Sequence, residues 1–218
     1  MRRHASGGGS TAGIRYIVFL IAFLLQGCYT LNGTVPFKYV PSLSSGDSIE
    51  MRAGMERLAD KRPSNDKSST ENIDDVSDKV TAKLLEDFRA SQLFTGLDLP
   101  PQKGKNDLIL RGDIKRFYWK ATPSPIAFIP IVNLAAYFGA PVTFIEAVVA
   151  IQLEVVSTKS GQVVATYERT ATREDSYTIY RRTAGEAGAE LAEAFRDVAK
   201  QLKESIVADA KAERFSKR

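Results

Sequence analysis

Cysteine and histidine are almost absent from this chain of 218 residues, which contains one of each, Cys28 and His4. With one residue of each type, the chain cannot form an internal disulfide or an ordinary zinc site. A catalytic centre built on a thiol or an imidazole is also excluded. The G-x-S-x-G, P-loop and G-x-G-x-x-G signatures are also missing. We therefore expect a protein that is not an enzyme and holds no cofactor or metal. A hydrolase that acts on glycan or lipid through carboxylates alone is the less favoured alternative.

Residues 1–27 have the pattern of an export signal. A basic start precedes the apolar run Tyr16–Leu25, whose ten residues are too few to span a bilayer, which needs about 20. The next residues, Leu25, Gln26, Gly27 and Cys28, resemble the lipobox of bacterial lipoproteins, whose cysteine is lipid-modified and becomes the first mature residue. We therefore expect acylated Cys28 to tether the protein to a lipid bilayer. The alternative is an uncleaved anchor with a chance cysteine.

Loss of this signal would change the charge of the protein. The chain has a formal net charge of +4, but three arginines and no acidic residues precede Cys28. The mature part would carry 27 basic and 26 acidic side chains, a net charge of +1. The basic pI is thus partly a property of the signal, and nucleic acid is not an expected partner. We expect a tether over 28–48, a single domain over 49–212 and a polar tail over 213–218.

The first half of the domain has one strand pattern and one helix pattern. Apolar and polar residues alternate roughly over 49–58, which predicts a strand. Asp60–Asn72 is polar and is expected to form a solvated loop or, alternatively, a partner-binding loop. From Ile73 the apolar residues recur every three or four positions, which predicts a helix that ends near Ser91–Phe94. The acidic residues Asp74, Asp75 and Asp78 suit the positive end of that helix better than a metal site.

The second half predicts strands followed by a helix. Residues 108–114, 145–156 and 163–173 alternate, and the last two form a long antiparallel hairpin around the turn 159–162. Thr183 and Glu186 form a capping box at the start of a helix with an apolar stripe through 206. The predicted fold class is α+β: an antiparallel sheet of about four to five strands with two amphipathic helices packed on one face.

The segment Ala121–Ile145 carries no charged residue and contains four prolines, which rules against one continuous membrane helix. Long apolar connections tend to be functional or covered. The connection either folds back over the core of the domain or binds a protein partner, a second copy or lipid, and a short helix is expected over 131–138. The candidate partner-binding residues are Phe117, Trp119, Ile126, Phe128, Ile131, Tyr137 and Phe138.

Three further stretches carry a family resemblance. Residues 60–63, 84–94 and 107–114 are similar to the "D-x-R-P", "dL-xx-s-x-lF" and "aD-x-xL-x-G-x-I" patterns of YajG-like lipoproteins and of auxiliary lipoproteins of ABC-type envelope transport. The resemblance implies a curved antiparallel sheet with two helices and a non-enzymatic accessory or assembly role in the cell envelope. Tyr29 after the lipidated position favours the periplasmic face of the outer membrane, with the inner membrane as the alternative. A self-oligomerising, pore-like component similar to the curli secretion lipoproteins is the second functional hypothesis.

Overall fold

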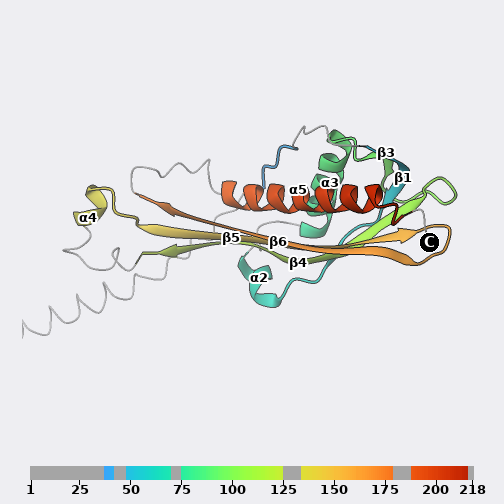
Figure 1. The fold of residues 1–218 in the computed structure, drawn as a ribbon. Helices are drawn as coiled ribbons and strands as arrows, with labels where there is room; N and C mark the ends of the chain where they lie inside the picture. Colours follow the sequence, from blue (N-terminus) through green and yellow to red (C-terminus); the bar gives the residue numbers. More distant parts are fainter. Residues whose placement is uncertain (1–36, 42–47, 70–74, 125–133, 179–187, 216–218) are drawn as a thin grey trace, which may run out of the picture.

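Six strands form one mixed sheet in the computed structural model, which describes residues 37–41, 48–69, 75–124, 134–178 and 188–215. The strand order is β3-β1-β4-β5-β6, and the short β2 pairs with β4. Figure 1 shows α3 and α5 above the sheet and α2 on the opposite side, next to β4. The strands are β1 (Ile49–Met55), β2 (Ala59–Asp60), β3 (Phe94–Asp98), β4 (Leu108–Pro123), β5 (Thr143–Ser157) and β6 (Val163–Tyr177), and the helices are α2 (Ser64–Ser69), α3 (Val76–Ala90), α4 (Leu134–Tyr137) and α5 (Ala189–Lys211).

The α+β class is confirmed, but the sheet is not wholly antiparallel. β4, β5 and β6 pair antiparallel over most of their length, so the predicted hairpin is confirmed. β1 instead pairs parallel with β3 and with β4, and β2 pairs parallel with β4. The reason is that α3 lies between β1 and β3 and returns the chain to the same end of the sheet, which makes the two strands parallel.

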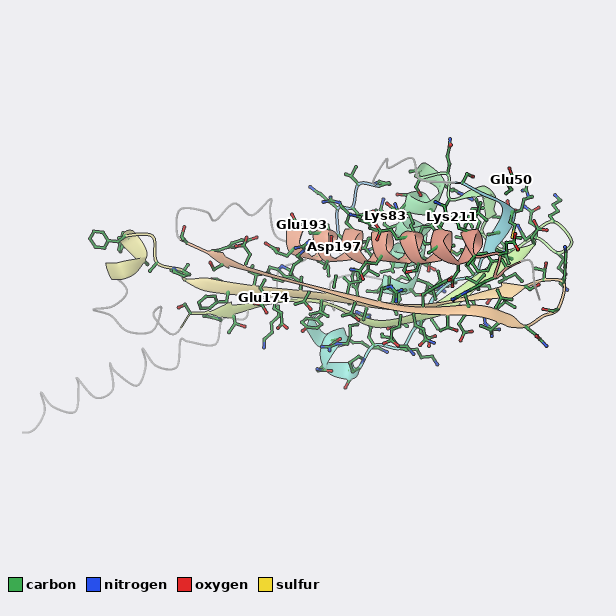
Figure 2. All side chains as sticks on the ribbon, viewed as in Figure 1. Glu50, Lys83, Glu174, Glu193, Asp197 and Lys211 are labelled. Carbon is green, nitrogen blue, oxygen red and sulfur yellow. The ribbon has the colours of Figure 1, made fainter. Side chains whose placement is uncertain are left out.

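The core lies between the sheet and the two long helices. The predicted stripe of α3 is buried at Val76, Val80, Leu84 and Phe88, as is the stripe of α5 from Leu191 to Ile206. The stripe of α5 packs on β6, β5 and β4, and the stripe of α3 packs on β3, β2 and α5, within one hydrophobic core. Figure 2 shows Lys83, Glu193 and Lys211 on the outer surfaces of these helices. The amphipathic pattern of both helices therefore matches the side each one buries.

The C-terminal part of the domain differs from the prediction at the start of α5 and after its end. α5 begins at Ala189, with Gly188 as its N-cap at φ 91°, whereas the capping box at Thr183 and Glu186 lies outside the described residues. At the other end, Phe215 was expected in a polar tail but is buried. Phe215 lines a small cavity together with Ile49 and Met51. The Phe215 side chain therefore packs on the domain.

A bulge divides β4 into two halves. The register with β5 shifts between Ile114 and Arg116, so one extra residue stands in β4. Before the bulge the even-numbered residues Leu108, Leu110 and Ile114 face the core, and after it the odd-numbered Phe117 and Trp119 do so. The strand therefore keeps one core-facing side along its whole length, with even-numbered residues on that side before the bulge and odd-numbered residues after it.

The second halves of these strands form an arm. Figure 1 shows β4, β5 and β6 continuing beyond the N-terminal end of α5, with α4 at the far tip. Ala121 pairs with Ile145 and Pro123 with Thr143, so both ends of the segment predicted as a connection belong to the sheet. The connection is therefore shorter than expected and runs from Ser124 to Val142. Its helix, α4, covers part of the helix predicted over 131–138.

Candidate functional surfaces

The segment that precedes β1 is docked on the domain. The Phe37 ring lies edge-on to Phe117 at 5.2 Å and to Phe195 at 5.3 Å, measured between ring centroids. The Tyr39 ring lies 4.8 Å from the same Phe195 ring, also edge-on. Edge-to-face aromatic pairs of this kind are worth about 0.5–1.5 kcal/mol beyond their burial. Residues 37–41 form neither helix nor strand, and through these ring contacts they pack on the domain.

Tyr39 also reaches a buried ion pair. Its hydroxyl donates a hydrogen bond to Asp87 of α3, and Lys203 Nζ of α5 lies 2.6 Å from the other oxygen of that carboxylate. Buried charges are stable only when paired in this way. In the sequence, Lys203 lies outside the apolar stripe of α5, which predicts a position on the solvent side of the helix. Only the partner on α3, 116 positions away, explains its burial, and the α5 sequence alone carries no signal of it.

The polar residues 60–72 do not form a solvated loop throughout. They contain α2, and the guanidinium of Arg62 is bound by Asp60 at 2.9 Å and donates to the Phe117 carbonyl at 3.2 Å. Asp66 of α2 is buried and pairs with Arg116 at 2.5 Å. The hydrogen bonds from Arg62 hold the pKa of the Asp60 carboxyl below its ordinary value. The "D-x-R-P" stretch is thus an ion-paired turn that attaches α2 beneath β4.

Two of the predicted surface residues lie in the core. Phe117 is fully buried and Trp119 is 7 % exposed, so neither borders an accessible surface. Trp119 Nε1 donates to Glu190 Oε2 at 3.1 Å, and Tyr177 donates to the other oxygen of Glu190 at 2.5 Å. Glu190 is therefore buried although the sequence places it on the outside of α5, because two donors from the arm satisfy its carboxylate.

The other predicted residues lie in the connection at the arm tip. Tyr137 is 66 % exposed and Phe138 is 90 % exposed. Ile126, Phe128 and Ile131 lie outside the described residues, as do Leu25, Gln26, Gly27 and Cys28 of the lipobox. The structure thus places two of the seven candidate partner-binding residues on an exposed surface and two in the core.

A row of polar contacts joins β6 to α5. Arg169 Nη2 donates to Ser205 Oγ at 2.6 Å, Tyr167 donates to Asp209 at 2.8 Å, and Arg173 pairs with Asp197. Burial raises the pKa of the Tyr167 phenol, and Asp209 adds to this effect. Because alternate residues of β6 meet successive turns of α5, this row fixes the helix along the edge strand. Sequence reasoning missed it because either element alone has an ordinary polar face.

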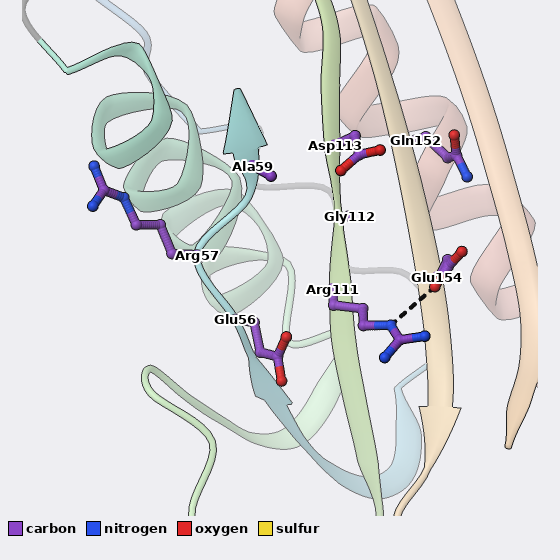
Figure 3. Close-up of a pocket in the computed structure, with 8 residues that line it drawn as sticks. All are labelled: Glu56, Arg57, Ala59, Arg111, Gly112, Asp113, Gln152 and Glu154. Carbon is purple, nitrogen blue, oxygen red and sulfur yellow. Dashed lines mark hydrogen bonds and ion pairs between the residues drawn. The ribbon is translucent and has the colours of Figure 1, made fainter. Parts of the chain in front are cut away.

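The opposite face of the sheet has a shallow charged groove (Figure 3). Its volume is about 210 Å³, below the roughly 300–1,000 Å³ of ligand pockets. Arg111 Nε lies 2.9 Å from Glu154 Oε2, so the main charges at its centre neutralise each other. The groove is lined by Glu56, Arg57, Ala59, Arg111, Gly112, Asp113, Gln152 and Glu154.

The acidic residues at the start of α3 have a structural role. The Asp75 side chain caps the helix by accepting from the Asp78 backbone amide, and Arg57 lies 2.6 Å from each of the two carboxylates. The hydrogen bond shared by the two carboxyls raises the pKa of Asp78 and lowers that of Asp75. Among the described residues there is no cluster of acidic, cysteine or histidine side chains that could hold a metal ion.

Near the base of the arm, Tyr118 donates a hydrogen bond of 2.8 Å to Glu146 on the open face of the sheet. Burial, together with the neighbouring Glu146, raises the pKa of the Tyr118 phenol to about 12. The tyrosine therefore stays protonated at neutral pH and donates a structural hydrogen bond to Glu146.

Comparison with known proteins identifies the fold. No family model matches the chain, and no curated protein matches it. Protein XCC0632 from Xanthomonas campestris, a DUF330 protein, is similar with a TM-score of 0.52 and 12% identity over 82% of this chain and 96% of that one. Lipoprotein B from Nitrosomonas europaea has a TM-score of 0.45 and 12% identity over 81% of this chain and 94% of that one. A PelC dodecamer from Paraburkholderia phytofirmans has a TM-score of 0.37 and 14% identity over 76% and 96% of the two chains.

At such low identities the likeness concerns the fold alone. The similarity to XCC0632 confirms, at the level of an α+β fold with a mostly antiparallel sheet, the resemblance to auxiliary lipoproteins. Within the part of the chain that the structure describes, no helix is long and apolar enough to cross a membrane.

Proposed function

We propose that this protein is a lipid-anchored lipoprotein on the periplasmic face of the outer membrane, where it acts as a non-enzymatic accessory or assembly subunit of an envelope complex. The observation that carries the proposal is the arm. Three paired strands extend past the helices and present Tyr137 and Phe138 to solvent. The body already has a complete core without these two rings, so their exposure serves contact with something outside the domain.

The lipobox supplies the second part of the proposal. Acylated Cys28 would hold the domain at a leaflet, and residues 29–36 would link it to the docked segment 37–41. The role of the domain is then positional, because the anchor keeps its surfaces close to the membrane. The likeness of the fold to XCC0632 and the motif resemblance support an auxiliary role.

The lipid anchor is tested by metabolic labelling with a radioactive fatty acid. The wild-type protein should incorporate label and fractionate with membranes, whereas Cys28→Ser should do neither. Gln26→Ala is the matched control, since it changes the lipobox region without removing the acceptor thiol. Label that persists in Cys28→Ser would refute the anchor.

The subunit role is tested on membranes dissolved in a mild detergent. Native mass spectrometry should find the chain bound to a different envelope protein. A monomer of the mature chain at every concentration would refute the subunit role. Multiples of the chain alone would favour the self-oligomerising alternative instead.

A further inference from the structure

Exposed aromatic rings are concentrated at one end of the molecule. Among the described residues, Tyr137, Phe138 and Phe144 are the aromatic side chains that stand out as exposed, at 66 %, 90 % and 45 %. All three belong to the arm. Tyr137 is the last residue of α4, Phe138 follows it directly, and Phe144 is the second residue of β5. Val163, another exposed apolar residue, starts β6 at the opposite end of the sheet. The arm tip, defined here as Tyr137, Phe138 and Phe144, is therefore a local patch.

The chemistry around the arm tip fits a lipid interface. No charged residue occurs between Lys120 and Glu146, and these two stand opposite each other at the base of the arm. Protein-binding hot spots commonly combine aromatic rings with arginine, and none of the described residues between Ala121 and Phe144 is an arginine. On the neighbouring strand of the arm, Asp175 pairs with Ile145, next to Phe144, so the one charge close to the patch is acidic and lies on β6. Exposed tyrosine and phenylalanine are typical of segments that rest in the headgroup region of a bilayer.

The length of the tether places a bilayer within reach of this patch. Phe37 is fixed against Phe117, and nine residue steps separate it from Cys28, which corresponds to at most about 30 Å of extended chain. From Phe117 to the end of β4 at Pro123 is six residue steps, or about 20 Å along the arm. A leaflet that holds the lipid of Cys28 can therefore also meet the tip of the arm.

We propose that the arm tip inserts Tyr137, Phe138 and Phe144 into the interface of the leaflet that carries the lipidated Cys28. This inference rests on the proposed lipid anchor and names the partner of the arm as a lipid surface. The domain then has two membrane contacts, the acylated cysteine and the aromatic tip. Two contacts restrict rotation of the domain more than one contact would.

The test uses the full-length lipidated protein. With Cys28 acylated, Phe138→Cys introduces the only free thiol, which takes an environment-sensitive nitrobenzoxadiazole label. The protein is then reconstituted into vesicles of phosphatidylethanolamine and phosphatidylglycerol with spin-labelled lipid. Val163→Cys, at the far end of the sheet, is the matched control. We expect a blue-shifted emission and at least threefold stronger quenching at position 138 than at position 163.

Equal emission and equal quenching at the two positions would overturn the lipid contact. Flotation of the unlabelled protein with the vesicles is read separately. Flotation without quenching at position 138 would refute the arm contact and leave the lipid anchor standing, whereas no flotation would refute both. In living cells, a photo-crosslinking residue at position 138 should form phospholipid adducts. Adducts to a protein or to a second copy of the chain in place of lipid would also overturn the inference.

Discussion

Lys203 Nζ lies 2.6 Å from Asp87 Oδ2 in the interior of the domain, where the lysine side chain is 9 % exposed and the aspartate side chain is fully buried. The hydroxyl of Tyr39 bonds the second oxygen of the same carboxylate. One buried charge pair thereby joins α3, α5 and the segment that leads to the proposed anchor. Removal of one member of the pair would leave the other charge buried without its opposite charge, which costs far more than the pair contributes.

The first prediction concerns this pair. Lys203→Met should lower the free energy of unfolding by about 3–5 kcal/mol, because Asp87 would stay buried and unpaired. The double variant Asp87→Leu with Lys203→Met should recover most of this loss, since it removes both charges. Urea unfolding followed by circular dichroism measures both values. A double variant that is no more stable than Lys203→Met would contradict the prediction.

Two phenylalanines that the sequence assigned to one surface should behave in opposite ways. Phe117→Ala should cost about 3–5 kcal/mol, because the fully buried ring leaves a cavity. Phe138→Ala should change stability by less than about 0.5 kcal/mol, because its ring is exposed. The same urea measurement compares them, and similar losses for both would argue against the position of Phe117 in the core.

Gly112 should not tolerate a side chain. A Cβ atom there would lie 2.0 Å from the backbone oxygen of Gln152, so Gly112→Ala forces β4 and β5 apart. We expect a loss of about 1–3 kcal/mol or more. The control is Gly96→Ala in β3, whose nearest contact is the flexible end of the Arg52 side chain at 3.0 Å. Thermal unfolding should separate the two variants clearly, and an equal melting temperature would refute the close approach.

Acid should weaken the turn before α2. Because Arg62 holds the pKa of Asp60 below its ordinary value, the stabilisation is present above the unfolded pKa, near 3.8, and is lost as the pH falls through the lower folded pKa. Asp60→Asn should therefore be less stable than the wild type at pH 6, and the difference should shrink as the pH falls from 4 towards 2. A constant difference across this range would exclude the ion pair as its cause.

The spacing of apolar residues predicted correctly those helices and strands that bury one face in the core. The stripe from Val76 to Phe88 and the alternation from Ile145 to Val155 gave the correct buried faces, because one apolar face is enough to set them. The parallel pairing of β1 was missed because alternation identifies a face and not a neighbouring strand. The ion pair of Asp66 with Arg116 was missed for a related reason, since its partners lie 50 positions apart.

The surface residues show a further limit of pattern reasoning. Tyr137 and Phe138 were recognised as candidates because an uncharged stretch of that length is unusual. Phe117 and Trp119 were placed with them because they lead into the same stretch. The bulge after Ile114 puts them on the core side, and no residue type in that part of the sequence marks its position.

That bulge also limits how the arm can change in length. Side chains alternate between the two faces, so adding or removing one residue beyond Arg116 would exchange the inner and outer faces of the arm, turning Trp119 outward and Tyr118 inward. A change of two residues would preserve both faces, provided that β5 and β6 changed by the same amount. Related chains that carry an insertion or deletion between the bulge and Trp119 should therefore differ there by an even number of residues, and an odd difference should coincide with a gained or lost bulge.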